Sequence, residues 1–381
     1  MRTVLSGLDQ IDLLAPFLQG KRLGLMTNQT GINSRFESAI DVLFHRFRLT
    51  ALFAVEHGIR GDVQAGEHYE TQPDPATGVP IWAVYGKTRR LTDEMLAQFD
   101  VLVFDMQDVG ARFYTYLYAL SYAMEECARA GKPVVVLDRV NLLGGEQVEG
   151  TVLDTAFASY VGMYPLPTRY GLTIGEYALW VKDYLRLDSL DLRVVPLSGW
   201  HRADQLDALS LPWAAPSPNC ATFHAALCYP GTCIFEGTNL SEGRGTTMPF
   251  EYIGAPWIDA PALEKRLRER ALPGLYFRPV YFTPTFSKFA GQLCAGVQMH
   301  ITDRRAARVT EGALVLLDEI QRLHPGRVEF LSNDGKRFFF DLLLGTDAYR
   351  RGQYDGPALL AAHADARKAF LEQRRPFLLY E

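Results

Sequence analysis

Val101-Leu102-Val103-Phe104 is the stretch that decides the fold of this 381-residue chain. The run is fully apolar, as expected of a strand in a parallel sheet that helices cover on both faces. Similar short apolar runs occupy residues 23–27, 49–55, 81–85 and 133–137. Helical spacing of apolar residues, often with a capping residue, falls at 34–46, 92–99, 113–130 and 173–187.

Strands that alternate with helices of this length form right-handed βαβ units. The fold class is therefore predicted to be α/β, with a Rossmann-like, mostly parallel sheet and helices on both faces over residues 1–198. A strand at 193–197 is expected to close this sheet. From Gly199 the pattern changes: strand-like segments at 274–280 and 293–301 flank helical ones at 260–270, 305–323 and 356–373. We expect a smaller α+β domain over residues 199–381.

Composition favours a globular protein of enzyme size, with 48% hydrophobic and 22% charged residues. A formal net charge of −5 argues against a nucleic-acid or membrane partner. The five cysteines include no CxxC pair, so neither a disulfide framework nor a zinc site is expected. The first twenty residues lack the layout of a secretory signal. The sequence as written predicts a cytoplasmic protein, or a periplasmic or secreted one if a leader was removed.

Polar side chains follow three of the apolar runs, where parallel strands end and ligands bind in open α/β sheets. They are Glu56, His57 and Arg60 after the first run, Asp105, Gln107, Asp108, Arg112 and Tyr114 after the second, and Asp138, Arg139 and Asn141 after the third. Carboxylates beside a titratable ring and fixed cations suit acid–base chemistry, so we predict a small-molecule cleft. Structural alternatives remain: Glu56 pairs with Arg60, Asp108 caps a helix and Arg112 neutralises Asp105.

The second half contributes a glycine-punctuated loop at 235–246 that carries Glu236, Asn239, Glu242 and Arg244. Aromatic residues flank it, and aromatic faces with polar side chains suit sugars; the alternative is a solvated surface loop. Rigid turns are predicted at 216–219, which includes Asn219, and at 229–232. Asp105 and Asp108 have a spacing that could hold Mg²⁺, but no phosphate-binding glycine loop accompanies them. The GxGxxG, GxSxG and HExxH motifs are missing, so no cofactor or metal is predicted.

Eight motifs in order resemble the DUF1343 family, now associated with the exo-β-N-acetylmuramidase NamZ. They are EHGIRGD (56–62), YGKTRR (85–90), FDMQDVGARFYTY (104–116), VVLDRVNLLGG (135–145), PTRYGLTIGE (167–176), PSPN (216–219), YPGTCIFEGTNLSEGRGT (229–246) and PFEYIGAPW (249–257). The resemblance implies a cleft between two domains that releases N-acetylmuramic acid from the non-reducing end of peptidoglycan fragments, without a redox cofactor. It also places the family's proposed catalytic glutamate on Glu56. The chain departs from the family at Tyr170, where His is usual, and at Val140 and Leu142, where Pro is usual.

Glycoside cleavage needs a proton donor and stabilisation of an oxocarbenium-like transition state. We expect Glu56 to be the general acid and Asp105 or Asp108 to be the second carboxylate, with Glu236 or Glu242 next. Arg60, Arg112 or Arg244 is expected to bind the lactyl carboxylate of muramic acid. The expected substrate is a muropeptide or an amino-sugar glycoside. The remaining substrate-binding candidates are His57, Gln107, Tyr114, Asp138, Arg139, Asn141, Tyr170, Glu176, Asn219 and Asn239. A non-catalytic amino-sugar-binding protein and a nucleotide- or metal-dependent enzyme are the alternatives, and the oligomeric state stays open.

Overall fold

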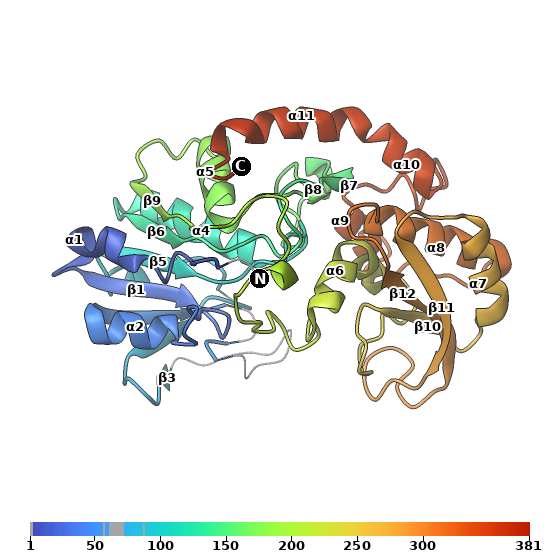
Figure 1. The fold of residues 1–381 in the computed structure, drawn as a ribbon, viewed down its shortest axis with the longest axis horizontal. Coiled ribbons are helices and arrows are strands. Elements are labelled where there is room, and N and C mark those ends of the chain that lie inside the picture. The colour runs from blue at the N-terminus through green and yellow to red at the C-terminus, as the bar shows by residue number, and fades with distance from the viewer. Residues whose placement is uncertain (1–2, 56–57, 61–71, 87) are drawn as a thin grey trace.

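The computed structural model describes residues 3–55, 58–60, 72–86 and 88–381. A seven-stranded sheet has the order β3-β4-β2-β1-β5-β6-β9, and all neighbours are parallel except the edge pair β3 and β4 (Figure 1). The strands are β1 (Arg22–Thr27), β2 (Arg48–Ala54), β3 (Gln72–Pro73), β4 (Pro80–Ala83), β5 (Val101–Asp105), β6 (Val134–Leu137) and β9 (Leu192–Val195). The predicted apolar runs therefore form the sheet.

Strand β5 lies inside this sheet, between β1 and β6. Val101 and Val103 belong to one buried cluster, with residues of α1 and α2, whereas Leu102 and Phe104 belong to another, with residues of α3, α4 and α5. The predicted arrangement of helices on both faces of the sheet is confirmed. These helices are α1 (Ala15–Leu18), α2 (Ala39–Arg46), α3 (Asp93–Leu96), α4 (Tyr116–Arg129) and α5 (Ile174–Tyr184).

Two helices begin later than predicted. Helix α2 is capped by the Ser38 hydroxyl, which accepts from the Asp41 amide; Ser34, the predicted cap, instead bonds to Asp9. Helix α4 begins at Tyr116, so residues 113–115 form a turn before it. Helix α5 has the predicted capping box between Thr173 and Glu176.

The second half contains an antiparallel three-stranded sheet in the order β10-β12-β11. Two predictions in this half are wrong. The expected turn at 229–232 is the C-terminal end of α6, and the expected helix at 356–373 is two helices separated by His363, whose Nδ1 accepts from the Val152 amide at 3.2 Å. The elements are β10 (Tyr252–Ala255), β11 (Leu275–Phe282), β12 (Cys294–Ile301), α6 (Phe223–Thr232), α7 (Ala260–Glu269), α8 (Val309–Leu323), α9 (Phe339–Leu344), α10 (Gly356–Ala362) and α11 (Ala364–Arg374).

The end of the chain returns to the first sheet. Helix α11 runs from the β10–β12 region toward α5, where the C-terminus lies (Figure 1). Arg374 Nη1 donates to the carbonyls of Tyr170 and Gly171 at 3.0 and 2.7 Å, and the Tyr380 hydroxyl donates to Asp138 at 2.5 Å. Residues 374–381 thus pack against the first half, while the boundary near residue 198 stays a prediction. Within the described ranges, no helix has the length and apolar character needed to cross a bilayer.

Candidate active site

Asp105, at the end of β5, is bound to Arg139 and is enclosed. Arg139 Nε and Nη2 donate to its two carboxylate oxygens at 2.5 and 2.8 Å. Burial raises the pKa of Asp105, and the Arg139 guanidinium opposes this effect. The alternative pairing of Asp105 with Arg112 is wrong: β5 and β6 are neighbours in the sheet, so Arg139, which follows β6, reaches Asp105 instead.

Asp108 is also buried, and its partner is Tyr170. The Tyr170 hydroxyl donates to Asp108 Oδ2, and the Gly110 amide donates to the same oxygen at 2.6 Å. Burial raises the pKa of Asp108 to about 7 in spite of these hydrogen bonds. Asp108 does not cap α4, whose N-cap residue is Thr115. The position at which the family usually has His therefore holds a tyrosine that is bonded to a buried carboxyl group.

All three arginines expected to bind a lactyl carboxylate have protein partners, including Arg112 and Arg60 in the first half of the chain. Arg112 is fully buried and donates to the carbonyl oxygens of Thr151, Leu166 and Leu343 at 2.6–2.8 Å. Arg60 forms an ion pair with Asp74 at 2.8 Å. Arg112 therefore supports the fold, in contrast to the expectation that it contacts substrate, and Arg60 is paired with a residue that the sequence did not point to.

Four other predicted site residues bond within the first half of the chain, and two of them, Asp138 and Glu176, also bond to the C-terminal segment. Asp138 accepts from Thr173 Oγ1, the Gly175 amide and Tyr380, and burial raises its pKa to about 7. Glu176 accepts from Arg202 Nη1 at 2.7 Å and from the Leu379 amide at 2.8 Å. The side chains of Asn141 and Gln107 bond to nearby backbone groups. The contacts described for these four residues are all to other parts of the chain, and their predicted role in binding substrate stays a prediction.

A cavity of about 390 Å³ is lined by residues from both halves of the chain. Tyr114, Glu236 and Arg244, which the sequence predicted as site residues, line it. The other lining residues come from four parts of the chain: Tyr85 and Arg89 after β4; Phe113, Thr115 and Tyr116 before and in α4; Ser159, Tyr160 and Val161; and Ser217, Tyr229, Phe250, Phe339 and Leu342 from the second half.

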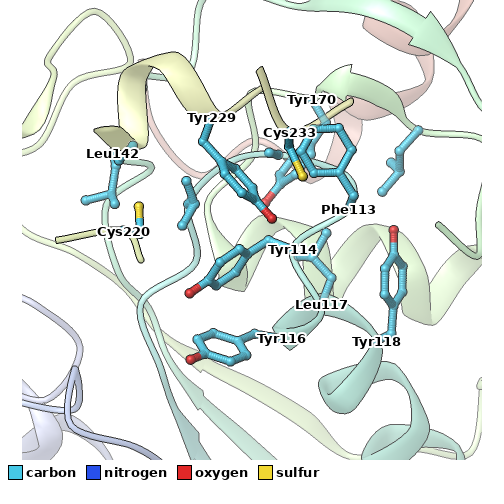
Figure 2. Close-up of a cluster of buried hydrophobic side chains, with 14 of the residues drawn as sticks. Phe113, Tyr114, Tyr116, Leu117, Tyr118, Leu142, Tyr170, Cys220, Tyr229 and Cys233 are labelled. Carbon is cyan, nitrogen blue, oxygen red and sulfur yellow. The ribbon is translucent and has the colours of Figure 1, made fainter. Parts of the chain in front are cut away.

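One wall of this cavity is aromatic. The ring centre of Tyr114 lies 4.8 Å from that of Tyr116 and 5.8 Å from that of Tyr229, and all three rings are seen together in Figure 2. Tyr229 in turn packs edge-on against Phe250 at 4.7 Å. Such a wall, combined with a few polar groups, is typical of sites that bind small organic ligands.

Glu236 is the carboxylate that lines this cavity among the described residues. Arg244 Nη2 donates to Glu236 Oε1 at 2.7 Å, and Arg244 Nε lies 3.3 Å from Glu242. Lys288 Nζ contacts Glu242 at 3.0 Å. Burial raises the pKa of Glu236, and the Arg244 cation opposes this effect. Glu236 is therefore a positioned carboxylate, and Arg244 is the strongest of the neighbouring groups that lower its pKa.

Glu242, Asn219 and Asn239 lie outside the cavity lining. The Glu242 side chain is only 2% exposed and bonds to Arg244 and Lys288. The Asn239 side chain donates to the Arg327 carbonyl and accepts from the Glu329 amide. Asn219 is buried in the predicted turn, from which Ser217 reaches the cavity. The catalytic candidate Glu56 and its neighbour His57 fall outside the residues that the structure describes, while Val55 before them is buried directly after β2.

Sequence reasoning did not single out Arg89, although it lies in the motif at 85–90. Its guanidinium lies 4.1 Å above the centre of the Tyr160 ring, and it has no acidic partner within the described parts of the chain. The adjacent Arg90 differs, because it pairs with Glu125 and Glu126 at 2.7 and 3.0 Å and does not line the cavity. The sequence offered no signal to separate these two arginines.

No group of three potential metal ligands is found in the part of the chain that the structure describes. The cavity instead offers a carboxylate, two arginines, hydroxyl groups and aromatic rings. This combination can bind a polar ring compound, orient an anionic substituent and transfer a proton.

Comparison with known proteins agrees with this chemistry. Residues 23–224 match the family model for the N-terminal part of the exo-β-N-acetylmuramidase NamZ, and residues 227–380 match that for its C-terminal part. The chain is 44% identical over 379 residues to the peptidoglycan β-N-acetylmuramidase NamZ of Bacillus subtilis, covering 97% of this chain and 90% of that protein.

Two crystal structures of DUF1343 family proteins from Bacteroides fragilis have the same fold. One is 34% identical with a TM-score of 0.90, and the other is 31% identical with a TM-score of 0.80. Each comparison covers 99% of both chains. The similarity therefore extends over the sheet and the second half of the chain.

Proposed function

Because the chain belongs to the exo-β-N-acetylmuramidase NamZ family, we propose that it is a glycosidase that removes terminal N-acetylmuramic acid from the non-reducing end of peptidoglycan fragments. The observation that carries this proposal is the cavity itself. It combines an aromatic wall with a carboxylate–arginine pair, and residues from both matched parts of the family line it.

Glu56 is the proposed general acid. It follows Val55 directly after β2, and the neighbouring strand β4 leads to Tyr85 in the cavity wall. The resemblance of the motif at 56–62 to the family pattern supports this role for Glu56. A carboxyl group in a partly desolvated cleft has a raised pKa and can donate a proton to the glycosidic oxygen near neutral pH.

Glu236 is the proposed second carboxylate, in place of Asp105 and Asp108. Asp105 is enclosed with Arg139 and Asp108 with Tyr170, whereas Glu236 lines the cavity and is 21% exposed. Its ionised form would orient the 2-acetamido group of the substrate or stabilise the positive charge of the transition state. Arg244 holds this carboxylate in one orientation.

The lactyl carboxylate that distinguishes N-acetylmuramic acid needs a cation. Arg244 already contacts two glutamates, whereas Arg89 has only the Tyr160 ring beneath it among the described residues. A guanidinium binds a carboxylate through two parallel hydrogen bonds. Arg89 is therefore the proposed lactyl contact, and Arg244 is the proposed support of Glu236.

A panel of three aryl β-glycosides tests this function. The sugars are N-acetylmuramic acid, N-acetylglucosamine and glucose, and release of the aryl alcohol is followed by absorbance. Turnover of the first glycoside in preference to the other two is expected. A protein that only binds amino sugars would release no chromophore from any of them.

A further inference from the structure

A second cavity adjoins the one described above and shares part of its wall. Its volume is about 500 Å³, and Glu236, Phe339 and Leu342 line both cavities. Phe339 and Leu342 are three residues apart on α9 and lie on the same side of that helix. The carboxylate of Glu236 thus stands at the boundary between two adjoining spaces.

The far side of the second cavity is formed by residues 331–337, a loop that is attached to the Glu236 segment. The Leu331 amide donates to the Gly237 carbonyl at 2.8 Å, and Thr238 forms a β-bridge with Phe330. Asp334 Oδ1 accepts from the amides of Lys336 and Arg337, both at 2.9 Å. The loop therefore has a defined shape and a fixed position relative to Glu236.

The lining of this second cavity suits a sugar. Leu331, Phe339 and Leu342 supply apolar surface, and Ser332, Asn333 and Arg337 supply polar groups. Arg337 Nη2 donates to the Ala158 carbonyl at 3.1 Å, and no carboxylate pairs with Arg337 among the residues that the structure describes. Its remaining N–H groups are donors for hydroxyl or acetamido oxygens.

The geometry points to a second sugar subsite between α9 and the 331–337 loop, which holds the N-acetylhexosamine that leaves when the terminal sugar is released. This inference rests on the proposed function. The terminal sugar occupies the aromatic cavity, the leaving sugar occupies the second cavity, and the bond between them lies beside Glu236. Arg337 and Asn333 contact the leaving sugar and not the terminal one.

The effects of a substitution on the two subsites can be distinguished with two substrates. One is the disaccharide of N-acetylmuramic acid joined to N-acetylglucosamine, and the other is the aryl glycoside of N-acetylmuramic acid, which has no second sugar. Arg337→Ala is expected to lower kcat/KM for the disaccharide about tenfold, the effect of losing one hydrogen bond from a charged group. The same variant is expected to cleave the aryl glycoside like the wild-type protein.

Asn333→Ala, in the same exposed loop, should show the same selective loss to a smaller extent. Arg351→Ala is the control, because Arg351 is 60% exposed and pairs with Asp347 away from both cavities. Equal effects of Arg337→Ala on the two substrates, or no effect on the disaccharide, would overturn the subsite. A wild-type protein that cleaves neither substrate would instead contradict the proposed function and remove the basis of this inference.

Discussion

Arg244 Nη2 donates to Glu236 Oε1 at 2.7 Å, and both side chains line the cavity between the two halves of the chain. Burial raises the pKa of Glu236, and the Arg244 cation is the largest effect that lowers it. If ionised Glu236 takes part in the reaction, Arg244 controls the pH range in which the protein is active.

Replacing Arg244 should therefore change the acidic side of the pH profile. A required carboxylate loses activity as the pH falls through its pKa, and removal of the neighbouring cation raises that pKa further. Arg244→Gln is expected to move the acidic limb of kcat/KM to higher pH. The aryl glycoside of N-acetylglucosamine is the suitable substrate, because it has no lactyl carboxylate. If the acidic limb of the variant lies at the same pH as that of the wild-type protein, Arg244 does not control the protonation of Glu236.

Arg89 and Arg90 form a matched pair of neighbours with different surroundings. Arg89→Ala is expected to lower kcat/KM for the N-acetylmuramic acid glycoside about tenfold, because a charge-assisted contact to the lactyl carboxylate is lost. The N-acetylglucosamine glycoside should be affected much less. Arg90→Ala serves as the control, since Arg90 pairs with Glu125 and Glu126 outside the cavity. If Arg89→Ala lowers kcat/KM equally for both glycosides, Arg89 makes no specific contact to the lactyl carboxylate.

The Asp105–Arg139 ion pair is expected to contribute to stability. Arg139→Met leaves the Asp105 carboxyl group buried without its cation, which should reduce the free energy of unfolding by about 3–5 kcal/mol. The double variant Asp105→Asn/Arg139→Met should recover much of that loss. Urea denaturation of the two variants measures both effects. A double variant as unstable as Arg139→Met alone would show that the pair is not coupled in this way.

Asp138 should make the stability of the protein depend on pH. Burial raises its pKa from 3.8 to about 7, so the folded state binds this proton more tightly than the unfolded chain. The stabilising contribution is present below pH 3.8 and is lost as the pH rises through 7. Asp138→Asn cannot ionise, so its stability relative to the wild-type protein should improve between pH 5 and pH 8. A difference in stability between Asp138→Asn and the wild-type protein that is constant over this pH range would contradict the raised pKa of Asp138.

The sequence predicted most of the sheet because β1, β2, β4, β5 and β6 contain short apolar runs, whereas the edge strand β3, formed by Gln72 and Pro73, has no apolar run and was not predicted. The helix at 113–130 was harder: the segment before Tyr116 has helical spacing, yet residues 113–115 form a turn that carries Tyr114 into the cavity wall. Local spacing cannot distinguish such a turn from a first helical turn.

Side-chain pairing was predicted less well, because it depends on which strands are neighbours. Asp105 bonds to Arg139 across β5 and β6, although Arg112 is nearer in the sequence. Arg89 and Tyr160 come from segments that no local pattern connects, so their place in the cavity wall follows only from the folded chain.

We propose that this chain hydrolyses a muramic acid glycoside with Glu56 and Glu236. The most direct measurement is kcat for the aryl glycoside of N-acetylmuramic acid, compared between the wild-type protein, Glu56→Gln and Glu236→Gln. Glu372→Gln, an exposed glutamate on α11, is the control for the substitution itself. Each active-site variant should keep its melting temperature and lose at least about 10²-fold in kcat. Near-wild-type turnover by Glu56→Gln or by Glu236→Gln would show that the replaced carboxylate takes no part in the reaction.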